Sequence, residues 1–178
     1  MIKNKTLRLV LAALFIAVGL YLPFLTGQIP EIGSRLLPMH IPVLLCGFVC
    51  GGGFGLMAGF MTPILRSLIF SMPPMYPGAV AMAFELAAYG LISGAMFSAM
   101  KCRKGAIIPS LLTAMVGGRL IWGAVRYIMT FATQTPFSVS LFMAGAILDA
   151  IPGIILQIVL IPILVLILQP IIVKSDRR

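Results

Sequence analysis

A single stretch, Leu36–Glu85, limits most strongly what this chain can fold into. It is apolar enough to lie in a lipid bilayer, yet it contains one His, one Arg, one Glu, six Pro and a run of three Gly. Polar groups and helix breakers are costly in hydrocarbon, where each backbone amide needs a partner within the protein. Their concentration in one stretch therefore indicates a site inside a membrane-embedded helical bundle.

The overall composition indicates a membrane protein. The 178 residues are 61% hydrophobic and 10% charged, whereas soluble domains carry about a quarter charged residues. The surplus apolar surface must face lipid, and the length suffices for about six helices of roughly 20 residues with short loops. We therefore predict an all-α integral membrane protein, a single domain of about six transmembrane helices over residues 1–178, with no room for a soluble catalytic domain.

The basic residues cluster in three places that an even number of membrane crossings brings to one side. Because basic loops stay on the cytoplasmic side, we expect both termini in the cytoplasm. Topology then explains the net charge of +9, and nucleic acid is not expected as a partner. The clusters are Lys3, Lys5 and Arg8; Lys101, Arg103 and Lys104; and Lys174, Arg177 and Arg178.

The expected helices follow the apolar runs between helix breakers. The first run is too long for a signal peptide and lacks a small-residue cleavage site, so we expect it to be retained. The second is short, about 14 residues, which requires tilt, local thinning of the bilayer or a buried position. Prolines exclude regular helix from Ser71–Gly78, which we expect to be a pre-shaped outer loop. The six helices are expected at residues 7–25, 37–50, 54–70, 79–100, 106–131 and 138–172.

The first helix presents small residues at helical spacing. Ala13 and Ala17 are four positions apart, so they share a face on which another helix can approach closely. The neighbour is either a partner protein or another span of this chain, and the residues alone leave both open.

Ionisable side chains gather in the outer half or at the midplane of the expected bundle. The fourth helix enters from outside, so Glu85 is expected roughly 9 Å deep, and Asp149 is expected roughly 16 Å deep on the sixth helix. A lone Arg at this depth costs about 3 kcal/mol even on lenient scales, so these groups either neutralise one another or bind a charged solute. The six residues, on five expected helices, are His40, Arg66, Glu85, Arg119, Arg126 and Asp149.

The balance of these charges favours an anionic solute. Three Arg face two carboxylates, which leaves one positive charge and a titratable His. A solute carboxylate or phosphate would supply the missing charge, and Arg binds either group with parallel hydrogen bonds. The alternative is that the ionisable groups pair internally and only fix the bundle.

The fifth helix carries a stripe suited to a ring that bears an anion. Arg119 and Arg126 are seven residues apart, about two helical turns, and Trp122 lies between them on the same face, with Tyr127 beside it. Aromatic side chains here either stack on a solute ring or serve as interface anchors and core packing. The residues expected to bind solute are His40, Arg66, Tyr76, Glu85, Tyr89, Arg119, Trp122, Arg126, Tyr127 and Asp149.

The sequence lacks catalytic motifs. It contains no HExxH, no Gly-x-Ser-x-Gly and no phosphate-binding loop, so neither hydrolase chemistry nor ATP hydrolysis is expected in this chain. The single His has no Cys or His at ligand spacing, so no metal is expected. The three Cys give no disulfide framework, and Cys46 and Cys50 are expected to pack as small apolar side chains.

Four segments carry a resemblance that covers nearly the whole chain. They are Leu37-Pro-Met-His-Ile-Pro-Val-Leu-Leu45, Gly59-Phe-Met-Thr-Pro63, Ser71-Met-Pro-Pro-Met75 and Phe84-Glu-Leu-Ala-Ala-Tyr-Gly90. The chain resembles the substrate-binding S components of energy-coupling-factor (ECF) vitamin transporters. Within that family it is similar to the branch associated with niacin, pantothenate, pyridoxine and hydroxymethylpyrimidine. It departs from the family at Gly51–Gly53, where a bulkier turn is expected.

The resemblance implies the high-affinity capture subunit of an importer in the plasma membrane of a bacterial cell. It implies that solute binds near the outer face, under the loops between the first and second and between the third and fourth helices. It equates Ala13 and Ala17 with the AxxxA signature that docks on a transmembrane coupling subunit. Two cytoplasmic ATPase partners would use ATP, the loaded bundle would rotate against the coupling subunit, and this chain would hold no cofactor.

A function of another class fits some of the same residues. A self-sufficient, proton-coupled carrier for a small organic anion would use His40, Glu85 and Asp149 as a proton relay. Such carriers often contain inverted repeats, but the first three helices share no motif with the last three. A purely structural scaffold is disfavoured because it gives the buried charges no purpose.

Overall fold

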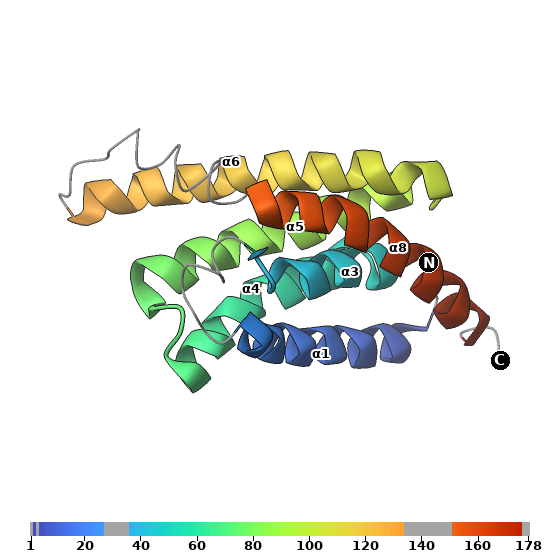
Figure 1. Cartoon of the computed structure of the whole chain (residues 1–178), viewed down its shortest axis with the longest axis horizontal. Coiled ribbons are helices and arrows are strands. Elements are labelled where there is room, and N and C mark those ends of the chain that lie inside the picture. Colours follow the sequence, from blue (N-terminus) through green and yellow to red (C-terminus); the bar gives the residue numbers. More distant parts are fainter. Residues whose placement is uncertain (1, 3, 27–35, 134–150, 176–178) are drawn as a thin grey trace.

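The chain folds into a bundle of helices (Figure 1). The computed structural model describes residues 2, 4–26, 36–133 and 151–175, and this part of the chain contains no strand. The beginning of the expected sixth helix, with Asp149, lies outside the described residues. The elements are α1 (Lys5–Tyr21), η1 (Leu22–Thr26), α3 (His40–Cys50), α4 (Gly52–Phe70), η2 (Met75–Ala79), α5 (Val80–Ala99), η3 (Lys104–Ala106), α6 (Ile107–Thr133) and α8 (Ile151–Ser175).

Five helical stretches in the described residues are long and apolar enough to cross a membrane. They contain α1, α4, α5, α6 and α8, which correspond to five of the predicted spans. The remaining helix, α3, has only 11 residues, or roughly 16 Å of the roughly 30 Å needed to span the hydrocarbon. The predicted all-α membrane architecture is therefore confirmed, while six crossings and cytoplasmic termini stay predictions.

The short helix α3 lies in the interior of the bundle. All 11 of its residues are buried, and it contacts α1, α4, α5 and α8. Of the three explanations for its length, burial is the one that the structure shows. Gly51 separates α3 from α4 with a φ of 97°, a value that favours glycine, so the chain reverses direction within a single residue.

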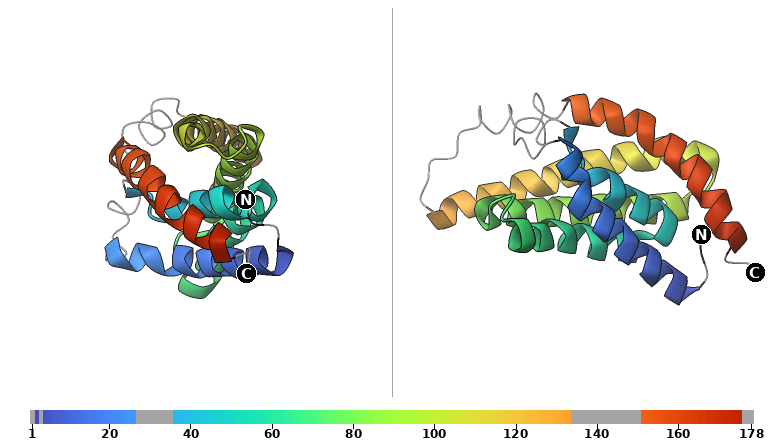
Figure 2. Two further views of the ribbon diagram at one scale, coloured as in Figure 1. Left: turned by 90° about the vertical axis from the view of Figure 1, so that its right-hand side faces the viewer. Right: turned by 60° about the horizontal axis from the view of Figure 1, so that its bottom comes forward.

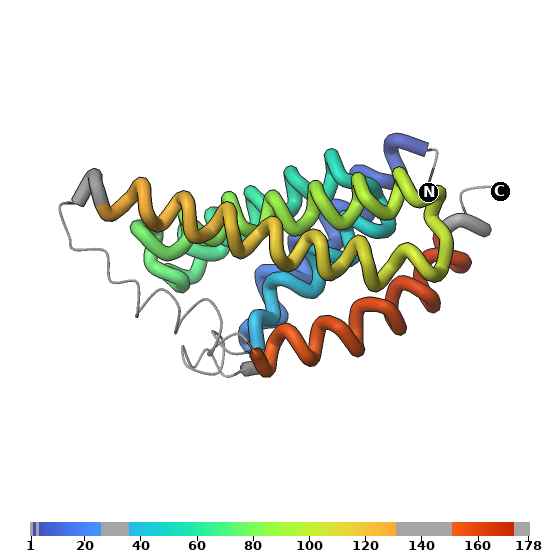
Figure 3. Tube along the Cα trace, turned by 90° about the horizontal axis from the view of Figure 1, so that it is seen from above, coloured from blue at the N-terminus to red at the C-terminus, as the bar shows by residue number. Residues whose placement is uncertain are grey.

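Successive helices run in alternating directions (Figures 1 and 3). The beginning of α1, the turn at Gly51, the loop between α5 and α6 and the end of α8 all lie at one end, on the right of Figure 1. We call this the basic end, because it carries Lys5, Lys101 and Lys104. The opposite end carries η2. Seen along α6, both α1 and α8 cross the bundle obliquely (Figure 2).

The proline-rich segment between α4 and α5 forms the expected irregular loop. Ser71 ends α4 in the left-handed region, with a φ of 57°, as is common after the last turn of a helix. Tyr76 is extended, with φ −119° and ψ 134°, inside the short turn η2. The prediction that this segment is not regular helix is confirmed.

Helices α4 and α5 approach each other closely along a line of glycines. A Cβ atom on Gly90 would overlap the carbonyl oxygen of Gly55, and one on Gly59 would overlap that of Leu86. Small residues of this kind allow helix backbones to pack in the absence of a hydrophobic driving force. This contact fixes α5, and with it the side chains that α5 contributes to the interior.

We predict that Gly90→Ala destabilises the fold. The added methyl group forces the two backbones apart, and overpacking of this kind costs about 1–3 kcal/mol. The measurement is the melting temperature of the purified protein in detergent. Gly53→Ala is the matched control, since a Cβ there meets nothing within 4 Å. Equal melting temperatures for the two variants would contradict the close contact.

Candidate functional site

Glu85 lies at the centre of a buried polar cluster formed by three helices. Its Oε1 atom is 3.1 Å from Arg119 Nη1 on α6 and 3.6 Å from His40 Nε2 on α3. Glu85 is 2% exposed and His40 is 1% exposed. Glu85 is also the only acidic residue in the described part of the chain. The carboxylate therefore ties α5 to α6 through an ion pair and faces the start of α3.

Tyr89 completes this group one helical turn after Glu85. Its ring meets the His40 ring edge to face, with centroids 5.0 Å apart. Gly118 makes room for it on α6, because a Cβ there would lie 2.6 Å from the Tyr89 ring. We call His40, Glu85, Tyr89 and Arg119 the Glu85 cluster; all were predicted to bind solute.

The predicted stripe on α6 extends from this cluster toward the end that carries η2. The guanidinium carbons of Arg119 and Arg126 lie 5.9 and 5.6 Å from the centre of the Trp122 ring. Both distances lie within the range of cation–π attraction, about 6 Å. Trp122 thus lies between two positive charges, as the seven-residue spacing indicated.

Several buried polar atoms in this part of the bundle have no hydrogen-bond partner among the described residues. They include both ring nitrogens of His40, and Nε and Nη2 of Arg119. Buried polar groups normally have partners, and an unpaired one costs about 1–3 kcal/mol. These atoms are therefore the natural contacts for a polar solute.

Gln157 on α8 is a further candidate that the sequence reasoning did not select. It is 0% exposed, and neither atom of its amide has a hydrogen-bond partner within the described residues. It belongs to a buried stripe on α8 at four-residue spacing, with Gly153, Ile161 and Val165. A single amide within a long apolar run is the sequence signal for Gln157, whereas the predicted site contains only ionisable and aromatic residues.

Arg66 lies away from the Glu85 cluster, where α4 packs against the end of α1. Its guanidinium donates to the carbonyl of Leu20, and its Cζ atom lies 5.0 and 5.4 Å from the ring centres of Phe24 and Phe70. Carbonyls in the last turn of a helix lack partners within the helix and form the negative end of its dipole. Arg66 therefore stabilises the end of α1.

The other predicted site residues lie at the rim or beyond the described part. Tyr76 is 50% exposed, and its hydroxyl donates to the carbonyl of Met129 at 3.4 Å, which joins the proline-rich loop to α6. Tyr127 is 49% exposed. Asp149 lies outside the described residues, so its predicted role stays a prediction.

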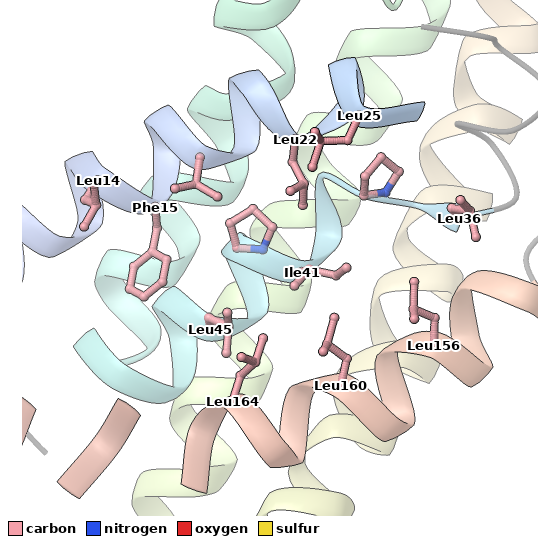
Figure 4. Close-up of a pocket in the computed structure, with 13 residues that line it drawn as sticks. Leu14, Phe15, Leu22, Leu25, Leu36, Ile41, Leu45, Leu156, Leu160 and Leu164 are labelled. Carbon is pink, nitrogen blue, oxygen red and sulfur yellow. The ribbon is translucent and has the colours of Figure 1, made fainter. Parts of the chain in front are cut away.

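An apolar groove opens between α1, α3 and α8 (Figure 4). It has a volume of about 370 Å³, and its lining includes Phe15, Ile41, Leu45 and Leu160. Thirteen residues line it, and all of them are apolar. A groove without hydrogen-bonding side chains suits hydrocarbon rather than a polar solute, so the Glu85 cluster is the better candidate for solute binding.

The described residues contain no group of three or more His, Cys, Asp or Glu side chains that could hold a metal ion. Cys46 and Cys50 are free thiols on α3, and both are buried in the apolar core. Their predicted role as small packing residues is confirmed.

The ion pair predicts a coupled effect on stability. Glu85→Gln or Arg119→Gln alone leaves the other charge buried without a counterion, which costs about 3–5 kcal/mol. The double variant leaves neither charge, so we expect it to melt at a higher temperature than at least one single variant. The measurement is a double-mutant cycle on thermal unfolding in detergent. Additive losses would show that the two side chains act independently.

Comparison with known proteins identifies the family of the chain. The family model for the substrate-specific component of ECF transporters matches residues 7–165. Searches of curated proteins and of solved structures give no match. The matched range contains the Glu85 cluster, the α6 stripe and Gln157. The chain therefore belongs to the family of substrate-specific components, the S components, of ECF transporters.

Proposed function

We propose that this chain captures a small water-soluble vitamin, or a vitamin precursor, at the Glu85 cluster. The observation that carries the proposal is the set of buried polar atoms on His40, Glu85 and Arg119 that have no hydrogen-bond partner among the described residues. In an apolar bundle such atoms are costly unless a ligand satisfies them. A polar molecule of vitamin size provides those partners.

The position of the cluster supports binding from the outer face. His40 is the first residue of α3 and Glu85 is the sixth of α5, so both lie toward the end that carries η2. Basic residues gather at the other end, which the positive-inside rule assigns to the cytoplasm. Solute therefore enters from outside, near the proline-rich loop, in the plasma membrane of a bacterial cell. The sequence resemblance to the niacin, pantothenate, pyridoxine and hydroxymethylpyrimidine branch supplies the range of candidate solutes.

The exposed face of α1 supports docking on a coupling subunit. Ala13 and Ala17 are exposed, whereas Ala12, Phe15 and Gly19 on the opposite side of α1 are buried. The small-residue pair is therefore directed outward instead of packing within this chain. In ECF transporters the S component works with a coupling subunit and with ATPases that use the ATP. The loaded bundle rotates against the coupling subunit to release solute inside the cell.

The first experiment is a binding screen on the purified, detergent-solubilised chain. Nicotinate, pantothenate, pyridoxine and hydroxymethylpyrimidine are titrated while the fluorescence of Trp122, the single tryptophan, is followed. We expect saturable quenching by one of them, because Trp122 lies beside Arg119 and Arg126. A response to none would contradict the proposed function.

Glu85→Ala and Arg126→Ala are expected to weaken binding of that solute while the protein still inserts in the membrane. The expected loss is about tenfold or more, because Glu85→Ala removes the carboxylate that positions Arg119 and Arg126→Ala removes a charged donor. Titration of Trp122 fluorescence measures the affinity, and membrane fractionation measures insertion. Unchanged affinity in both variants would place the site elsewhere.

The double variant Ala13→Leu/Ala17→Leu is expected to keep solute affinity and lose uptake. Bulky side chains prevent the close backbone approach that small residues allow. The readouts are copurification with the coupling subunit and uptake by cells that also express the ATPases. Ala124→Leu, at an exposed position of α6, is the matched control. Accumulation by this chain without partners would instead establish the self-sufficient carrier.

A further inference from the structure

We infer that the solute is a monocarboxylate, held by the Nε and Nη2 edge of Arg119. This inference rests on the proposed function and specifies the chemistry of the same site. Arg119 directs one nitrogen toward Glu85, whereas two others have no hydrogen-bond partner among the described residues.

Arg119 uses only part of its guanidinium group for the ion pair. Nη1 is the atom that lies 3.1 Å from Glu85 Oε1. Nε and Nη2 are buried and have no hydrogen-bond partner among the described residues. In arginine these two nitrogens point parallel N–H bonds along one edge, which matches the two oxygens of a carboxylate. One nitrogen therefore forms the ion pair with Glu85, and the Nε and Nη2 edge has the geometry to bind a planar anion.

Among the described residues, the charges beside this edge favour a ligand with one negative charge. Arg119 and Arg126 carry two positive charges on either side of Trp122, and Glu85, the only described acid, carries one negative charge. The sum is one positive charge, which a monocarboxylate neutralises. A phosphate monoester carries about −1.5 to −2 at pH 7 and would leave an excess of negative charge beside Glu85.

A neutral ligand fits this edge less well than a carboxylate. A carboxamide or alcohol presents one neutral acceptor oxygen, which cannot meet both parallel N–H bonds in line and forms no charge-assisted pair. The ring nitrogens of His40, near the same Glu85 oxygen, have no hydrogen-bond partner among the described residues and can bind a second polar group of the same ligand. A carboxylate attached to a polar body therefore satisfies more of the orphaned atoms than an uncharged molecule does.

The test compares carboxylates with their neutral counterparts on the unchanged chain. Nicotinate is compared with nicotinamide, and pantothenate with pantothenol, by titration of Trp122 fluorescence in detergent. Pyridoxine and pyridoxine 5′-phosphate represent a neutral ligand and a phosphate ester. We expect one carboxylate to bind at least about tenfold more tightly than its neutral counterpart, the usual scale for a lost charge-assisted bidentate pair.

A variant of Arg119 tests the edge itself. Arg119→Lys keeps the positive charge opposite Glu85 but removes the parallel donors, so carboxylate affinity should fall about tenfold or more. The affinity for the neutral counterpart should change much less. Arg103→Lys, at an exposed position near the basic end, is the matched control and should bind like the unchanged chain. Because the ligand pairs are compared on the unchanged chain, the test does not depend on folding of the variant.

The outcomes separate this inference from the proposed function. Tight binding of pyridoxine, hydroxymethylpyrimidine or a phosphate ester, with no carboxylate preferred, would overturn the monocarboxylate and leave vitamin capture intact. Equal carboxylate affinity in the unchanged chain and in Arg119→Lys would show that Arg119 serves only to neutralise Glu85. Failure of every compound to bind would overturn both.

Discussion

The ion pair between Glu85 and Arg119 is the interaction on which the interior of this bundle depends. Either charge alone would be too costly to bury in a membrane, whereas together they neutralise each other within a few ångströms. The pair joins α5 to α6, and His40 places the start of α3 against it. The helix α3 is too short to span the bilayer and is buried along its whole length, and the polar cluster lies at its first residue, His40.

Close helix packing holds the ion pair in place. Gly55, Gly59 and Gly90 bring the backbones of α4 and α5 together, and Gly118 lets α6 approach the Tyr89 ring. These glycines contribute no polar chemistry, yet they determine the distance between the residues that do. The same bundle contains an apolar groove between α1, α3 and α8, and none of the residues of the Glu85 cluster lines it.

The local parts of this arrangement could be predicted from the sequence, and the long-range parts only in outline. The Arg119, Trp122 and Arg126 stripe follows from helical periodicity, so its geometry was predictable. The depths expected from the sequence put His40, Glu85 and Arg119 in the outer half or at the midplane of the membrane. They did not indicate which of these side chains contact one another. The expected depth also assigned Arg66 to this group. In the structure, the face of α4 that carries Arg66 is directed toward α1, where Arg66 donates to the carbonyl of Leu20. Gln157 was missed because it has no charge, and its burial depends on how α8 packs.

Under the proposed function, the chain must remain folded without its solute and still favour binding strongly, and Arg119 can meet both demands. An isolated arginine in the interior would bind an anion but would destabilise the empty bundle. An arginine fully paired with internal carboxylates would stabilise the bundle but have no donors left. Arg119 lies between these extremes, with one nitrogen against Glu85 and one edge unpartnered among the described residues. Glu85 thus reduces the cost of the empty state without using the donors that a ligand needs.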